Sequence, residues 1–248
     1  MEKELLATGG EVLVDDTFII CHFPSPRLVL STSLYNGGYL MADNVFNHRL
    51  NFFVASEQAL PGGCMESYLA LAAEKCGLNP KTATGLLTSA RMHCRGYSKL
   101  SYRELTVEVI ATAGVEQNAA RAGDPALYWE EAGSYRSVGG TINVLALTNS
   151  KLPHGTMAKA LISITEAKTA LLQELAVVSP VTLKPATGTG TDGVIIVSNP
   201  DASFCCTDAG TQSKLGEMFC LAAKSAIKQA LYKECNIGDA LEEQGGTC

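Results

Sequence analysis

The stretch from Ala186 to Asp192 reads Ala-Thr-Gly-Thr-Gly-Thr-Asp and is rich in groups that can contact a ligand. Its glycines permit backbone conformations and close approaches that side chains would block, and its threonine hydroxyls can donate or accept hydrogen bonds. Asp192 ends the stretch just before an apolar run at 193–197, where a carboxylate can be partly desolvated. Asp192 is therefore a candidate for chemistry; an aspartate that only ties its own turn together is the alternative. The candidate ligand contacts in this loop are Thr187, Gly188, Thr189, Gly190 and Thr191.

Lys168 interrupts an apolar helix face. Apolar residues recur at intervals of three and four between 156 and 175, which predicts an amphipathic helix. Lys168 falls in the middle of that face, whereas Glu166 lies nearly opposite. Because burying an unpaired ammonium costs several kcal/mol, Lys168 needs a counter-charge, and Asp192 is the nearest carboxylate on the strand that follows. We expect both to point into one site, with a purely structural ion pair as the alternative. The face comprises Met157, Ala160, Leu161, Ile164, Leu171, Leu172 and Leu175.

Two further polar groups stand at strand ends. Asn143 shares a strand face with Leu145 and Leu147, so it is either a bonded core amide or an amide that polarises a carbonyl. Thr141 lies beside it. A second loop can line the same pocket or form only a turn, and its candidate residues are Ser31, Asn36, Gly37 and Gly38. We predict that residues 31–38, 140–143 and 187–192 line one cleft.

Other site types have little support. The four histidines are far apart and the nine cysteines lack paired CxxC spacing, so we predict reduced cysteines and no structural zinc. The Gly-Thr-Gly-Thr-Asp loop precedes a strand rather than a helix, which argues against a helix N-terminus that cradles phosphate. A net charge of −6 without a basic block argues against a nucleic-acid partner. No apolar run has membrane length and the N-terminus lacks a secretory pattern, so we expect a cytoplasmic protein.

The elements that must hold these groups fall into two halves. The first third predicts short strands at 11–14, 17–21 and 27–31 in a hairpin meander, with a turn at Pro24-Ser25-Pro26. The second half has the spacing of a βαβα unit, and its strand at 193–198 is apolar on both faces, which predicts a central strand. We predict a single domain spanning 1–248, α+β in class: a layered domain with a mixed β-sheet, an antiparallel N-terminal meander and a C-terminal βαβα unit. The other expected elements are a helix at 66–76, strands at 84–89, 105–113 and 140–148, and helices at 156–175 and 213–233.

Several segments resemble the adenosylcobinamide amidohydrolase family of corrinoid salvage, in the family's order and over roughly residues 28 to 232. The signatures are Gly140-Thr141-Ile142-Asn143, Thr165-Glu166-Ala167-Lys168 and the loop that ends at Asp192. Leu30-Ser31-Thr32, Asn36-Gly37-Gly38, Gly85 to Ala90, Ile110 to Val115 and Asn118 to Gly123 add to them. One departure is Gln212, where many relatives are expected to carry a histidine; if that histidine is catalytic in them, its loss bears on activity here.

The resemblance implies an enzyme that cuts the aminopropanol amide of adenosylcobinamide to give adenosylcobyric acid. On that interpretation the corrinoid is substrate rather than cofactor, the partner is a small molecule, metal dependence is open and a homo-oligomer is possible. Asp192 would activate or orient water, Lys168 would stabilise charge or deliver a proton, and Asn143 with the 187–191 loop would polarise the carbonyl. The rival hypotheses are a non-catalytic corrinoid-binding protein and, less favoured, a nucleotide-dependent transferase.

Overall fold

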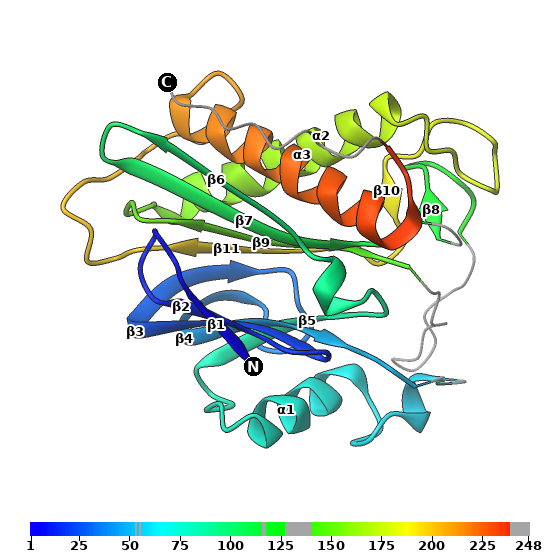
Figure 1. The fold of residues 1–248 in the computed structure, drawn as a ribbon, viewed down its shortest axis with the longest axis horizontal. Helices are drawn as coiled ribbons and strands as arrows, with labels where there is room; N and C mark the ends of the chain where they lie inside the picture. Colours follow the sequence, from blue (N-terminus) through cyan, green and yellow to red (C-terminus); the bar gives the residue numbers. More distant parts are fainter. Residues whose placement is uncertain (53, 55, 116–117, 127–139, 239–248) are drawn as a thin grey trace.

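The computed structural model describes residues 1–52, 54, 56–115, 118–126 and 140–238. Within these ranges the chain forms a mixed nine-stranded sheet, a small two-stranded sheet and the helices α1 (Met65–Lys75), α2 (His154–Glu174) and α3 (Lys214–Cys235) (Figure 1). The strands of the large sheet are β1 (Glu2–Leu5), β2 (Glu11–Val14), β3 (Phe18–Ser31), β4 (Gly38–Arg49), β5 (Ala83–Thr88), β6 (Gly96–Tyr102), β7 (Leu105–Ala113), β9 (Ile142–Thr148) and β11 (Gly193–Ser198). The small sheet pairs β8 (Ala119–Ala120) with β10 (Gly188–Thr189), and two short 3-10 helices are η1 (Glu57–Ala59) and η2 (Met92–Cys94).

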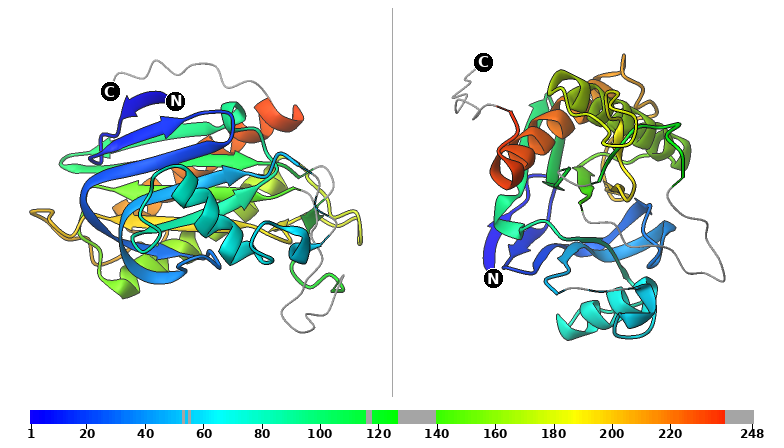
Figure 2. Two further views of the ribbon diagram at one scale, coloured as in Figure 1. Left: turned by 90° about the horizontal axis from the view of Figure 1, so that it is seen from below. Right: turned by 90° about the vertical axis from the view of Figure 1, so that its right-hand side faces the viewer.

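The large sheet curls so that its two halves face each other (Figures 1 and 2). Its main path is β1-β2-β3-β11-β9-β7-β6, and β4 branches from β3 to pair with β5. In the figures, α2 and α3 cover the half formed by β6, β7, β9 and β11, while α1 covers the half formed by β1 to β5. The layers therefore follow in the order α2 with α3, the sheet half of β6, β7, β9 and β11, the sheet half of β1 to β5, and α1. None of the helices in the described ranges is long and apolar enough to cross a membrane.

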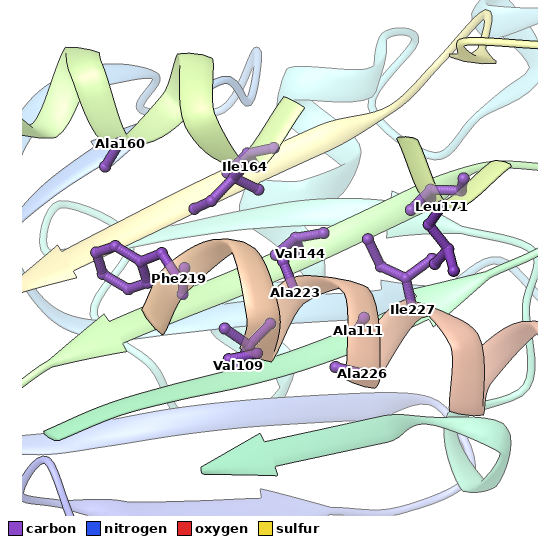
Figure 3. Close-up of a cluster of buried hydrophobic side chains, with 14 of the residues drawn as sticks. Val109, Ala111, Val144, Ala160, Ile164, Leu171, Phe219, Ala223, Ala226 and Ile227 are labelled. Atoms are coloured by element: carbon purple, nitrogen blue, oxygen red, sulfur yellow. The ribbon is translucent and has the colours of Figure 1, made fainter. Parts of the chain in front are cut away.

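Three groups of buried side chains fill the spaces between these layers. The largest lies under α2 and α3, where Phe219 and Ile227 meet Val109 and Val144 of the sheet (Figure 3). A second, which includes Val29 and Ile195, lies between the two sheet halves. A third packs Leu69 and Ala73 of α1 against Phe46 of β4. Because β11 contributes Val194 and Ile196 to the first group and Ile195 and Val197 to the second, it is covered on both faces, as predicted.

The predicted fold class is confirmed. The strands β1 to β4 pair antiparallel in chain order, and β9-α2-β11-α3 forms the βαβα unit, with β9 and β11 parallel neighbours. Their register sets Gly193 opposite Asn143, so the starts of both strands lie side by side. The face assignment of α2 also holds, since Lys168 is buried and Glu166 is exposed.

The prediction of two strands at 17–21 and 27–31 was wrong. They form the single long strand β3, and Pro24-Ser25-Pro26 is no turn but lies where the pairing with β4 shifts register between His22 and Arg27. Prolines, which cannot donate to a ladder, are tolerated at such irregularities. Here β3 also changes neighbours, because its first half pairs with β2 and its second half with β11. One bent strand therefore joins the two halves of the sheet.

Candidate active site

A cavity of about 330 Å³ lies between the starts of β9 and β11 on one side and β5 with α1 on the other. The β9 and β11 side contributes Gly140, Thr141, Asn143 and the run Gly190 to Gly193. The opposite side is largely apolar. It includes Leu60, Met65, Leu69, Leu86 and Leu87, together with Glu57. The cavity is thus polar at the loop that precedes β11 and apolar toward α1.

Asp192 is held at this cavity by bonds to both of its carboxylate oxygens. Oδ1 accepts from the backbone N–H of Ile142 at 3.0 Å and from the hydroxyl of Thr189 at 2.5 Å. Oδ2 accepts from the backbone N–H of Thr189 at 2.9 Å and from the ammonium of Lys168. A carboxylate has about four acceptor positions, so Asp192 is fully bonded and its orientation is fixed. Among these four donors, the side chain of Thr189 contributes a hydroxyl, so its proton is in direct contact with the carboxylate of Asp192.

Lys168 reaches Asp192 from α2, as the helix pattern predicted. The two side chains are only 10% and 11% exposed, and the pair is closed over by Gly188. A Cβ at position 188 would lie 2.4 Å from Oδ2 of Asp192 and 2.8 Å from Nζ of Lys168. A side chain at this point of the loop would therefore displace the ammonium or the carboxylate.

The rest of the loop is fastened to the start of β9. The hydroxyl of Thr141 donates to the carbonyl of Thr191 at 2.7 Å, and the hydroxyl of Thr191 donates to the carbonyl of Gly140 at 3.1 Å. Asn118 adds a bond from its amide to the same Gly140 carbonyl at 2.7 Å. Asn118 was quoted above only as part of a family segment, not as a site residue. Asn118 supports the site structurally, because its buried side chain bonds to the segments before β9 and before β11.

Asn143 is a bonded core amide whose side chain joins the two sheet halves. Its Nδ2 donates to Oδ1 of Asn47 on β4 at 2.8 Å and to the carbonyl of Leu87 on β5 at 3.0 Å, and Asn47 in turn donates to the hydroxyl of Thr112 on β7 at 2.8 Å. Both amide hydrogens of Asn143 are thereby used. The geometry favours a positioning role, while its assignment to carbonyl polarisation stays a prediction.

The cleft predicted from three segments is formed in part. The segments around 140–143 and 190–193 line it together, and Thr32, Ser33 and Leu34 line it from the β3–β4 connection. Thr187, Gly188 and Thr189 lie outside the lining, and the hydroxyl of Thr187 accepts from the backbone N–H of Ala122 at 2.8 Å. The hydroxyl of Ser31 accepts from Thr84 at 3.0 Å.

The remaining candidates of the 31–38 segment, at positions 36–38, lie in the turn between β3 and β4. Asn36 has a φ of 49° and donates to the carbonyls of Pro80 and Ala83, each at 2.8 Å. Gly37 packs so tightly that a Cβ there would lie 2.0 Å from the carbonyl oxygen of Ser33, and Gly38 has a φ of 83°. None of these three residues lines the cavity. A substrate-binding role stays a prediction for all ten candidates, which are Ser31, Asn36, Gly37, Gly38, Thr141, Thr187, Gly188, Thr189, Gly190 and Thr191.

Gln212 is exposed in the connection before α3 and is not among the residues that line the cavity. The side chain at position 212 therefore does not contribute to this cavity. Among the described residues, no cluster of three or more His, Cys, Asp or Glu side chains is placed to hold a metal ion.

Comparison with known sequences gives a family match over nearly the whole chain. A family profile described as adenosylcobinamide amidohydrolase matches residues 5–239. An uncharacterized protein of Methanocaldococcus jannaschii is 36% identical over 177 residues, which cover 66% of this chain and 68% of that protein. The family expected from the sequence signatures is thus confirmed.

Solved structures with a similar arrangement have unrelated sequences. A protein of Pyrococcus horikoshii matches with a TM-score of 0.47 at 10% identity, over 94% of this chain and 83% of that one. A β-aminopeptidase of Burkholderia sp. matches with a TM-score of 0.40 at 12% identity, over 93% and 82% of the two chains. An L-aminopeptidase D-Ala-esterase/amidase of Ochrobactrum anthropi, itself described as a variant among the Ntn hydrolase fold, matches with a TM-score of 0.36 at 12% identity, over 90% and 81%. Likenesses at this level carry no argument about mechanism.

Proposed function

The chain belongs to the adenosylcobinamide amidohydrolase family, and from that membership we propose that it hydrolyses the amide between a corrin propionyl side chain and aminopropanol in adenosylcobinamide, releasing adenosylcobyric acid. The observation that carries the proposal is the hydrogen-bonded cluster of Lys168, Asp192 and Thr189, of which Asp192 lines the cavity. Such a cluster brings a cation, a base and a hydroxyl together at one point. These are the groups that amide hydrolysis requires.

The size of the cavity supports a mode of binding in which only part of the substrate enters. Pockets that enclose drug-sized ligands have volumes of about 300 to 1,000 Å³. A volume of about 330 Å³ suits the amide arm with its aminopropanol, whereas the much larger corrin ring stays outside. The scissile amide is then held near the Gly190 to Asp192 segment.

Two routes to the carbonyl carbon fit the bonds of Asp192. In the first, a water displaces one of the present donors, gives a proton to Asp192 and adds to the carbonyl; the C–N bond then breaks, and aminopropanol leaves with that proton. In the second, the hydroxyl of Thr189 gives its proton to Asp192 and attacks, so that an ester forms as aminopropanol leaves with a proton, and water then hydrolyses the ester. The 2.5 Å bond between the Thr189 hydroxyl and Oδ1 of Asp192 supports this route, because a threonine nucleophile needs an adjacent base. In both routes Lys168 offsets the negative charge of the site.

The decisive experiment is incubation of the purified protein with adenosylcobinamide, followed by chromatography and mass spectrometry. Formation of adenosylcobyric acid and aminopropanol in equal amounts supports the proposal, and a requirement for ATP would instead indicate the transferase. Binding of adenosylcobinamide without turnover would identify a non-catalytic corrinoid-binding protein. A cytoplasmic location stays a prediction that cell fractionation tests. Self-association also stays a prediction, and sedimentation of the purified protein tests it.

A further inference from the structure

Glu57 carries a buried carboxylate oxygen that has no hydrogen-bond partner among the described residues. The residue lies in η1, is 9% exposed, and lines the cavity on the side of Leu60, Met65 and Leu69. Its Oε1 accepts from the backbone N–H of Met65, the first residue of α1, at 2.9 Å. Its Oε2 is shielded from water and receives no hydrogen bond from any part of the chain that the structure describes. Buried polar atoms without a partner are rare and call for an explanation.

The fold itself does not explain the second oxygen. The bond to Met65 needs only one acceptor, which a glutamine would supply equally well. An unpaired buried carboxylate oxygen is unfavourable wherever it serves no further purpose. By contrast, the carboxylate of Asp192 at the other end of the cavity is bonded at both oxygens by the protein. Of these two cavity carboxylates, Glu57 is therefore the one that has an acceptor left for a ligand.

The surroundings of Glu57 define the kind of group that it would accept. The neighbouring Leu60, Met65 and Leu69 favour a short aliphatic group, and the free oxygen requires an N–H or O–H donor on it. A small amino alcohol joined through an amide meets both requirements. This end of the cavity lies across from Asp192, where the amide would be cut.

We propose that Glu57 is a specificity residue that recognises the aminopropanol part of the substrate: on binding, its carboxylate turns toward the cavity and Oε2 accepts a hydrogen bond from that part. The inference rests on the proposed function and extends it by assigning the leaving-group end of the cavity. Glu57 holds the arm and does not touch the reacting carbonyl.

The test is Glu57→Gln, which can keep an oxygen for the Met65 N–H while replacing the free acceptor with a donor. Equilibrium binding of adenosylcobinamide should weaken by about 10- to 100-fold, the usual range for a hydrogen bond to a charged group. Binding of adenosylcobyric acid, which lacks aminopropanol, should be unchanged. The melting temperature without ligand should stay the same or rise, because an unpaired buried carboxylate is removed. Glu66→Gln is the matched control, since Glu66 is exposed in the first turn of α1, and it should change neither affinity.

Each other outcome overturns the inference in a recognisable way. Equal losses for both corrinoids together with a lower melting temperature would mean that Glu57 is structural. Unchanged affinity for adenosylcobinamide in Glu57→Gln would refute the recognition role while leaving the proposed function intact. If the wild-type protein binds neither corrinoid, the proposed function fails and this inference fails with it.

Discussion

The ammonium of Lys168 and the carboxylate of Asp192 form an ion pair between α2 and the start of β11, with both side chains about nine-tenths buried. The two residues are 24 positions apart, and the right-handed type of crossover that joins parallel strands brings the helix back over the sheet. Removing one partner of such a pair leaves an uncompensated buried charge, which costs about 3 to 5 kcal/mol. Stability and activity must therefore be measured separately for any variant of the pair.

Lys168→Met and Asp192→Asn should each lower amide hydrolysis by about a hundredfold or more, the scale of general acid–base groups. Each should also unfold at lower urea concentration than the wild type, whereas the double variant, which leaves no lone charge, should recover part of that loss. Initial rates with adenosylcobinamide and urea unfolding curves check both statements. Lys159→Met is the control, because Lys159 is exposed on the same helix. Near-normal turnover in a folded single variant would return that residue to a structural role.

Gly188→Ala should disturb the ion pair without unfolding the protein. The atoms that its Cβ would crowd, Oδ2 of Asp192 and Nζ of Lys168, are the far ends of side chains that can move apart. We expect at least a tenfold drop in the hydrolysis rate, since small displacements of catalytic groups have effects of that order or larger. Gly155→Ala is the matched change on α2, where an added Cβ meets nothing within 4 Å, and it should retain full activity. Wild-type rates for Gly188→Ala would show that the pair tolerates the displacement.

The two nucleophiles can be distinguished at Thr189. If its hydroxyl attacks the amide, acid quenching during turnover should trap a covalent adduct on Thr189 that mass spectrometry detects. Thr189→Ser should then retain measurable turnover and Thr189→Ala should lose nearly all of it. If water attacks, no adduct forms and Thr189→Ala loses only the support that the 2.5 Å bond gives to Asp192, about tenfold. Thr182→Ala serves as a control, because that hydroxyl donates to Asp124 and Thr182 does not line the cavity.

Local sequence patterns were sufficient for the βαβα half of the fold and for the ion pair. Lys168 stands out because it breaks an apolar face of regular spacing, and Asp192 because it ends a polar loop before an apolar strand. Each signal can be recognised within one short segment of the sequence, without knowledge of the tertiary contacts. The antiparallel meander was likewise visible in runs of β-branched residues, although β3 bends where two separate strands were predicted.

Other parts of the site depend on contacts that no local pattern encodes. The strand β4 carries Asn44 and Asn47 on buried positions, so it lacks the apolar alternation of a strand and was not predicted. Asn47 meets Asn143 from the other sheet half, across a distance of 96 residues in sequence. Glu57 was missed for the same reason, because only the packing of η1 against α1 shows that its carboxylate is buried. Neither residue has a spacing signal that would have identified it.

His48 on β4 predicts how stability depends on pH. Its Nδ1 lies 3.1 Å from the carbonyl of Thr17 and must donate to it, so Nε2 accepts from the hydroxyl of Tyr68 at 2.9 Å, and the ring stacks on Phe18. Burial lowers the pKa of His48 from its ordinary value of 6.5, against the smaller opposing effects of the Thr17 carbonyl and Asp15.

Because the folded pKa of His48 is lowered, the unfolded chain binds a proton at this site more readily than the folded protein does. The resulting stability is complete above pH 6.5 and is lost as pH falls below 6.5 toward the lowered folded pKa, by at most about 1.4 kcal/mol per pH unit. His48→Gln should remove this contribution to the pH dependence. The free energy of unfolding, measured with urea, should therefore fall less between pH 8 and pH 5 in His48→Gln than in the wild type. His93→Gln is the control, since His93 is exposed, and it should follow the wild-type curve. Parallel curves for the wild type and His48→Gln would show that other groups govern the acid sensitivity of the fold.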